Sequence, residues 1–203
     1  MRIKALVFAT MCFAGLHGQE HAAKSLISKE PLTSEQIAIY RAVLADYTQG
    51  DDSRLNIANT TEPFSIGFGV ERACLKGFAI PVKSGSKIVH RVDTAVIFSS
   101  SMVLVDADKQ SDLVKKNDSA NLLHRAIDDH EQVSDKELEK SVEEAFATGL
   151  FTFSEIVFNK QHTGAVVQYS FVCGELCGNG STIVLKKVRG KWMKNKTCGG
   201  WIS

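Results

Sequence analysis

Residues 165–173 read Ala165-Val166-Val167-Gln168-Tyr169-Ser170-Phe171-Val172-Cys173. In an extended chain Val167, Tyr169, Phe171 and Cys173 lie on one face, and Gln168 and Ser170 lie on the other. This period of two is typical of a half-buried strand in an antiparallel sheet. The stretch therefore predicts that the C-terminal part of the chain is built on such a sheet.

Three further segments near this stretch have the composition of strands. They are 153–158, 182–188 and 192–197, and the loops between the strands are 159–164, 174–180 and Arg189-Gly190. Short loops between consecutive strands favour a meander. Leu55–Ala58 reads as a shorter strand upstream, and 95–98 and 102–105 read as strands or other buried segments.

Two helices are predicted from their capping residues. Thr33 and Gln36 form one capping box, and Ser134 and Glu137 form a second, with Gly149 placed to end that helix. The apolar stripe behind the first box is Ile37, Tyr40, Val43, Leu44 and Tyr47, and the stripe behind the second is Leu138, Val142, Ala145 and Phe146. We expect an α+β fold, with N-terminal and central helices on a mainly antiparallel sheet that ends in a C-terminal β-meander.

The N-terminus has the pattern of a secretory signal. Arg2 and Lys4 precede an uncharged apolar run at 5–16, which is too short to span a bilayer and is followed by polar residues. We expect residues 1–18 to be a signal peptide and residues 19–203 to be a single domain, secreted or periplasmic, with no membrane segment after cleavage. A buried first helix is the alternative.

The charges of the expected mature chain nearly cancel. Of 24 basic residues, Arg2 and Lys4 leave with the signal, so 22 remain against 23 acidic ones. Such a balance lacks the basic surface that nucleic acid or an anionic membrane requires. Nucleic acid is therefore not an expected partner.

Four cysteines remain once Cys12 is removed with the signal. An even set in an oxidising compartment is typical of disulfides, and four cysteines allow three pairings. We favour Cys173–Cys177, which would close a tight loop, with Cys74–Cys198 tying the end of the chain back. The spacing alone does not choose among the pairings.

Several segments together resemble a family of uncharacterised exported bacterial proteins, many of them from soil bacteria. The most specific part runs from Cys173-Gly174-Glu175-Leu176-Cys177-Gly178-Asn179-Gly180 through Lys191-Trp192 to Cys198-Gly199-Gly200-Trp201-Ile202-Ser203. Residues 39–44, 59–61 and 104–106 are similar to the N-terminal half of that family. The resemblance covers most of the mature chain and implies export and one folded unit, but it implies no activity.

The Cys173–Cys177 segment also has chemical readings. A dithiol oxidoreductase usually has two residues between its cysteines and a helix N-terminus at the attacking one, whereas this pair ends a strand. A zinc site would need Cys198 and either Cys74 or a histidine. The glycines at 174, 178 and 180 precede a strand rather than the helix that a phosphate loop requires, so a tight turn or bulge is favoured.

The candidate ligating and acid–base residues are few. His124, Asp128, Asp129 and His130 form the one dense group, in which His124 and Asp128 would share a helix face and could hold a divalent ion, although a solvated segment explains them equally well. His90 and His162 read as isolated surface or loop residues. No metal or cofactor is predicted.

The two tryptophans are the last candidates. Trp192 and Trp201 either pack in the core or form an aromatic surface for a glycan or protein partner. The leading hypothesis is a non-catalytic, disulfide-containing exported domain that binds or scaffolds a partner. The alternatives are an extracytoplasmic hydrolase with dispersed residues, which a cleft joining His90, His124 or Asp128 to a carboxylate would favour, and a thiol-redox or metal protein using Cys173 and Cys177.

Overall fold

The computed structural model describes residues 25–49, 53–66, 70–80, 88–128, 130 and 132–203. The expected signal peptide at 1–18 and the candidate ligand Asp129 lie outside these residues.

The main sheet combines parallel and antiparallel pairs. Its order is β4 (Met102–Val105), β2 (Leu55–Ala58), β5 (Leu150–Phe153), β7 (Gly164–Gly174), β8 (Cys177–Val188) and β9 (Lys191–Ile202), and β6 (Val157–Phe158) pairs with β7. Strand β2 runs parallel to both β4 and β5, and the pairs from β5 to β9 are antiparallel. A second, two-stranded sheet pairs β1 (Leu26–Ile27) with β3 (Ile88–Val89). The predicted α+β class and C-terminal meander are confirmed.

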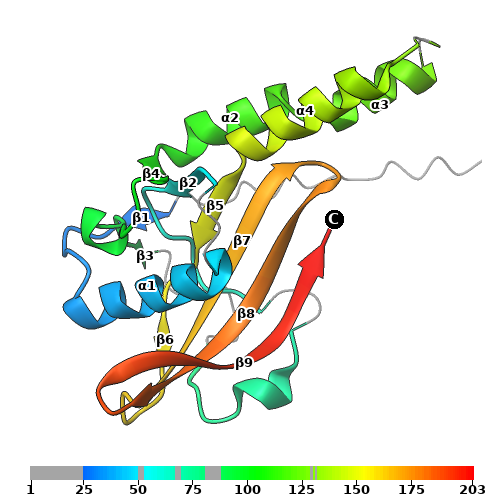
Figure 1. The fold of residues 1–203 in the computed structure, drawn as a ribbon. Coiled ribbons are helices and arrows are strands. Elements are labelled where there is room, and N and C mark those ends of the chain that lie inside the picture. Colours follow the sequence, from blue (N-terminus) through cyan, green and yellow to red (C-terminus); the bar gives the residue numbers. More distant parts are fainter. Residues whose placement is uncertain (1–24, 50–52, 67–69, 81–87, 129, 131) are drawn as a thin grey trace, which may run out of the picture.

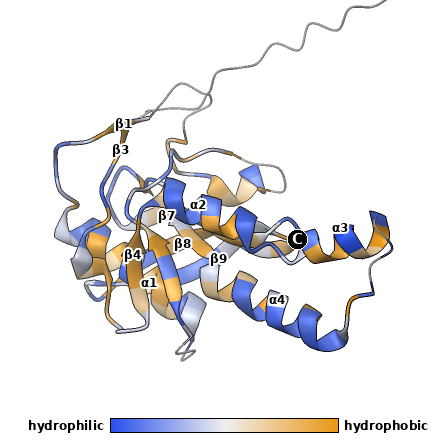
Figure 2. Ribbon diagram, turned by 90° about the horizontal axis from the view of Figure 1, so that it is seen from above, coloured by the Kyte–Doolittle hydropathy of each residue, from blue (hydrophilic) through white to orange (hydrophobic). Residues whose placement is uncertain are grey.

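One face of the main sheet is covered by α1 (Ser34–Thr48), as Figure 1 shows. Its capping box is present, with the Thr33 side chain accepting from the Gln36 backbone N–H at 3.2 Å. The helix packs Tyr40 and Tyr47 onto the aromatic side chains of β5, with ring centroids 4.6 Å apart for Tyr40–Phe153 and 4.8 Å for Tyr47–Phe151. Figure 2 shows that hydrophobic residues concentrate in the strands beneath it.

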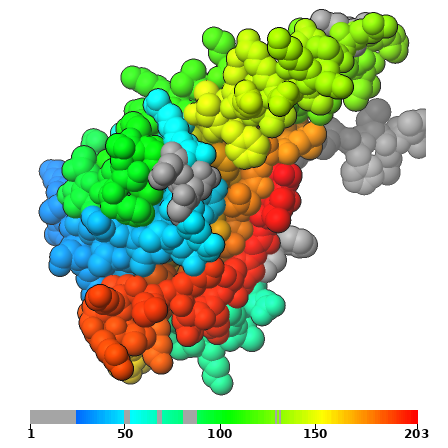
Figure 3. Space-filling view, viewed as in Figure 1, coloured from blue at the N-terminus to red at the C-terminus, as the bar shows by residue number. Residues whose placement is uncertain are grey.

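The remaining helices lie towards one end of the sheet. They are α2 (Ala107–Lys116), α3 (Ala120–Asp128) and α4 (Asp135–Thr148), with short 3₁₀ turns η1 (Arg72–Leu75) and η2 (Thr94–Val96) elsewhere. Helices α3 and α4 extend beyond the sheet (Figures 1 and 3). The predicted apolar stripe of α4 is only partly buried, since Ala145 is buried whereas Val142 is 37% and Phe146 54% exposed. None of the helices among the described residues is long and apolar enough to cross a membrane.

Two local predictions, at 153–158 and 174–180, are wrong, and one that left two alternatives open is decided. The strand expected at 153–158 is broken between β5 and β6, because the Gln168 backbone N–H donates to the Ser154 hydroxyl while the Ser154 carbonyl accepts from the Tyr40 hydroxyl. The segment at 95–98, expected as a strand or another buried segment, begins in η2 and contains the fully buried Val96. Asp93 accepts the Ala95 backbone N–H at 2.7 Å and caps that turn. The loop expected at 174–180 is only a tight turn, because β8 already begins at Cys177.

Candidate functional site

The sheet face opposite α1 changes character along β7 and β8. Near the start of β7 it is apolar, with Val166 facing Val184 across the strands. This half is buried under residues 63–66 and 70–80, here called the cover segment, which contributes Phe64 and Leu75 to a separate core cluster. The cover segment is joined to β9 by the disulfide Cys74–Cys198 and by the Glu71 backbone N–H, which donates to the Cys198 carbonyl at 3.0 Å.

Beyond the cover segment the same face becomes polar. Thr152 and Ser170 are cross-strand neighbours whose hydroxyl oxygens lie 2.8 Å apart. Gln168 donates to the Thr182 hydroxyl at 3.0 Å and accepts from the Ser65 backbone N–H at 3.2 Å. These side chains are held in fixed orientations by one another, and their hydroxyl and amide groups line a cavity of about 440 Å³.

Trp201 forms one wall of this cavity, which we call the Trp201 cavity. Its β9 position faces Gly180, and the indole lies over Gly178 and Gly180 of β8. A side chain at Gly178 would meet indole atoms at 3.1 Å, so the aromatic ring can lie on the strand only because these positions carry no Cβ. Trp201 is 43% exposed, which leaves part of its surface open to a ligand.

Glu62 brings a carboxylate to the Trp201 cavity. It is the one charged side chain among the described lining residues, and it is held near the strands by its bridge to Ser154. Surrounding protein desolvates the carboxylate and raises the pKa of Glu62 above its usual value, while a hydrogen bond from Thr152 opposes that rise. Glu62 nevertheless remains exposed, so the carboxylate is accessible from the cavity.

A histidine–carboxylate pair adjoins Glu62 through Thr61, the preceding residue in the chain. His90 Nδ1 is 2.9 Å from Glu155 Oε2, and the His90 backbone N–H donates to Glu155 Oε1 at 2.8 Å. The Thr61 hydroxyl donates to the same carboxylate. The prediction that His90 is an isolated residue is therefore wrong, because His90 pairs with Glu155.

This pair does not reach the ligand-accessible surface of the Trp201 cavity. Neither His90 nor Glu155 is among the residues that line it. These contacts from His90 and Thr61 end at the Glu155 carboxylate, so they hold Thr61 and Glu155 in place. The adjacent residues in the chain, Glu62 and Ser154, are positioned with them.

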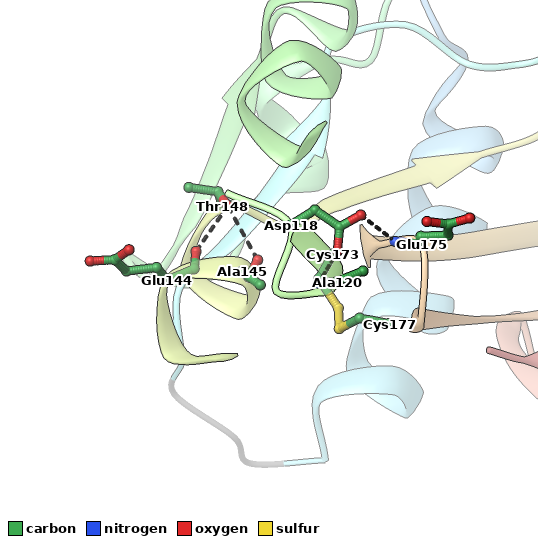
Figure 4. Close-up of a disulfide and its surroundings, with 8 residues drawn as sticks. All are labelled: Asp118, Ala120, Glu144, Ala145, Thr148, Cys173, Glu175 and Cys177. Atoms are coloured by element: carbon green, nitrogen blue, oxygen red, sulfur yellow. Dashed lines mark hydrogen bonds between the residues drawn. A yellow bond between two sulfur atoms is a disulfide. The ribbon is translucent and has the colours of Figure 1, made fainter. Parts of the chain in front are cut away.

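The second disulfide, Cys173–Cys177, closes the turn between β7 and β8 (Figure 4). Asp118 accepts the Glu175 backbone N–H at 2.7 Å and the Ala120 backbone N–H at 2.9 Å, so one carboxylate connects this turn to the start of α3. Cys173 is fully buried. The environment is that of a structural link between the hairpin and the helices rather than of an accessible thiol.

The other predicted candidates are dispersed. His124 lies 3.5 Å from Glu175 at an exposed position, and His162 lies 3.7 Å from Glu35. In the part of the chain that the structure describes, no three histidine, cysteine, aspartate or glutamate side chains are grouped so as to hold a metal ion. His130 follows α3 after the undescribed Asp129 and has a positive φ of 53°.

The two tryptophans have different environments. Trp192 is buried, with Phe158 at a centroid distance of 6.1 Å and the Lys187 ammonium 5.5 Å from its ring. Only Trp201 combines exposure with a cavity. The alternation that places Gln168 and Ser170 on one side of the strand was the sequence pattern that indicated the polar face of the sheet. No local pattern indicated that Glu62 would lie beside it.

Replacing Gly180 with valine is expected to displace the Trp201 indole from the sheet. A Cβ at this position would overlap the indole, so the ring must move toward solvent. In a Trp192→Phe background, where Trp201 is the sole tryptophan, we expect red-shifted emission and greater acrylamide quenching. Asn179→Ala, at a neighbouring position on the opposite face, is the control. Unchanged quenching in Gly180→Val would show that the indole does not lie on this glycine.

No family model matches the chain, and neither the curated proteins nor the solved structures include a match.

Proposed function

We propose that this chain is an exported, non-catalytic binding domain, and that the Trp201 cavity is its site for a glycan. The observation that carries the proposal is the half-exposed indole of Trp201 lying over glycines at the edge of a cavity rich in hydroxyl groups. An aromatic face packs against the C–H face of a sugar ring, and side chains with fixed hydroxyl and amide groups hydrogen-bond its hydroxyls.

Export is supported by two independent features. Residues 1–18 have the charge and hydropathy pattern of a signal peptide, and the protein contains two disulfides, which persist in oxidising compartments. The resemblance to exported bacterial proteins agrees with this location. Together they support a secreted or periplasmic site of action.

The catalytic alternatives have less support. His90 is paired with Glu155, but that pair is outside the cavity lining, and Glu62 is the sole carboxylate among the described residues that line it. Glycoside hydrolysis commonly uses two carboxylates that flank the bond. The thiol-redox alternative would require Cys173 to become accessible, whereas it is buried and disulfide-bonded.

The Trp201→Ala substitution tests the proposal. We expect a loss of affinity for a soluble β-1,4-linked hexasaccharide of at least about tenfold, because an aromatic anchor of a binding site contributes on the order of 1.5–2 kcal/mol. Isothermal titration calorimetry with cellohexaose and with N-acetylchitohexaose would measure the affinity of the wild-type protein and of the variant. Since Trp201 is partly exposed, the fold should be retained, as far-ultraviolet circular dichroism can verify.

Ile202→Ala is the matched control. Ile202 follows Trp201 on β9, is 89% exposed and pairs with Asn179 rather than with a glycine of the cavity, so its removal should leave affinity unchanged. Binding that survives Trp201→Ala, or that Ile202→Ala weakens to the same degree, would contradict the assignment of the site.

A further inference from the structure

The Glu62 carboxylate lacks a cationic partner in the part of the chain that the structure describes. The ion pairs among the described residues join other side chains, and the Glu62 carboxylate accepts a hydrogen bond from Thr152. Because Glu62 is exposed, water solvates its carboxylate in the free protein, and the charge is open to a cationic ligand. The Trp201 cavity therefore contains one negative charge that the described protein groups do not balance.

A ligand with a positive charge would supply the missing partner. A protonated amine placed at Glu62 would form a charge-assisted hydrogen bond, which is shorter and stronger than a bond between neutral groups. An indole face also attracts a nearby cation. Glu62 and Trp201 thus favour the same kind of ligand, a cationic one, and both disfavour an acidic one.

The other lining groups narrow the ligand class further. Thr152, Ser170, Gln168 and Thr182 provide hydroxyl and amide groups along the three neighbouring strands β5, β7 and β8. A hydroxyl or amide oxygen can accept a further hydrogen bond while it keeps its partner in the protein. This spacing therefore suits a ligand with several hydroxyls distributed over a ring, whereas a simple aliphatic amine would use few of these groups.

Resting on the proposed function, we propose that the Trp201 cavity binds an amino sugar, with its ammonium group paired to the Glu62 carboxylate and its ring packed on Trp201. The hydroxyls of the sugar hydrogen-bond to the side chains of β5, β7 and β8. Glu62 is then the residue that determines specificity, and Trp201 the residue that provides general affinity for sugar rings.

The experiment compares three β-1,4-linked hexasaccharides of equal length by calorimetry: glucosamine, N-acetylglucosamine and glucose hexamers. We expect the glucosamine hexamer to bind the wild-type protein about tenfold more tightly than the other two, because it alone carries ammonium groups. In Glu62→Gln, which keeps the shape of the side chain and removes its charge, the three affinities should agree within about twofold. Trp201→Ala should weaken binding of all three.

The outcomes separate this inference from the proposed function. Equal affinities in the wild-type protein, or a glucosamine preference that persists in Glu62→Gln, would overturn the amino-sugar inference and leave a neutral-glycan site. Absence of binding by all three hexamers would overturn the glycan proposal itself. A second measurement covers the case in which Glu62→Gln does not fold: the wild-type preference for glucosamine should shrink as salt is raised from 0.05 to 0.5 M, whereas a preference that salt does not change contradicts pairing of charges.

Discussion

Removal of the Cys74–Cys198 disulfide is expected to lower the free energy of unfolding by about 5 kcal/mol, the value that chain entropy predicts for a loop of this length. The two cysteines are 124 residues apart, so the bond restricts most of the unfolded chain. The same bond holds the cover segment against β9. Replacement of both cysteines by alanine, followed by equilibrium unfolding in urea, measures the effect.

The other disulfide provides a control of the same chemistry. Cys173 and Cys177 are only four residues apart, and their double alanine variant should lose about 2 kcal/mol by the same reasoning. Cys198 and Cys173 are both fully buried, so the packing contributions of the two variants are comparable. Equal decreases in the free energy of unfolding of the two variants would show that loop length does not determine how much each disulfide stabilises the protein.

Phe151→Ala is expected to lower the free energy of unfolding by about 3–5 kcal/mol, the usual cost of removing a buried phenylalanine. Phe151 is fully buried in β5, and its ring lies 4.8 Å from that of Tyr47, 5.0 Å from Phe153 and 5.4 Å from Tyr169. Loss of this ring leaves a cavity between α1 and the sheet. Urea unfolding again measures it.

Phe146→Ala is the matched control for this prediction. Phe146 is a phenylalanine of α4 that is 54% exposed, with its ring 6.1 Å from that of Phe171. We expect the free energy of unfolding to fall by about 1 kcal/mol or less, because folding buries little of the apolar surface of this half-exposed ring. A loss at Phe146 as large as that at Phe151 would place the core of the molecule elsewhere.

The elements that sequence predicted well depend on local interactions. The capping boxes at Thr33 and Ser134 are visible in four consecutive residues, and both are present in the structure. From 167 to 173 the period-two pattern of β7 follows from the different burial of its two faces, whereas 165–167 are buried on both. The parallel pairing of β2 with β4 and β5 had no such signal, since it joins segments distant in the chain.

The same distinction applies to the candidate site. Gln168 and Ser170 were recognisable as one polar face, and Trp201 was a candidate aromatic surface. Glu62 could not be placed, because its position follows from a bridge to Ser154, more than ninety residues away. The break between β5 and β6 lies at the same residue, Ser154, and is the reason that the prediction of one strand at 153–158 is wrong.

The link between the cover segment and β9 also affects how the protein would respond to proteolysis. A single backbone cut anywhere between Cys74 and Cys198 divides the chain into two pieces that the disulfide still joins. One piece carries Glu62 and the other carries Trp201, so both of these lining residues of the cavity remain in one covalent molecule. Such a nicked protein would keep its intact mass, apart from one added water, until the disulfide is reduced.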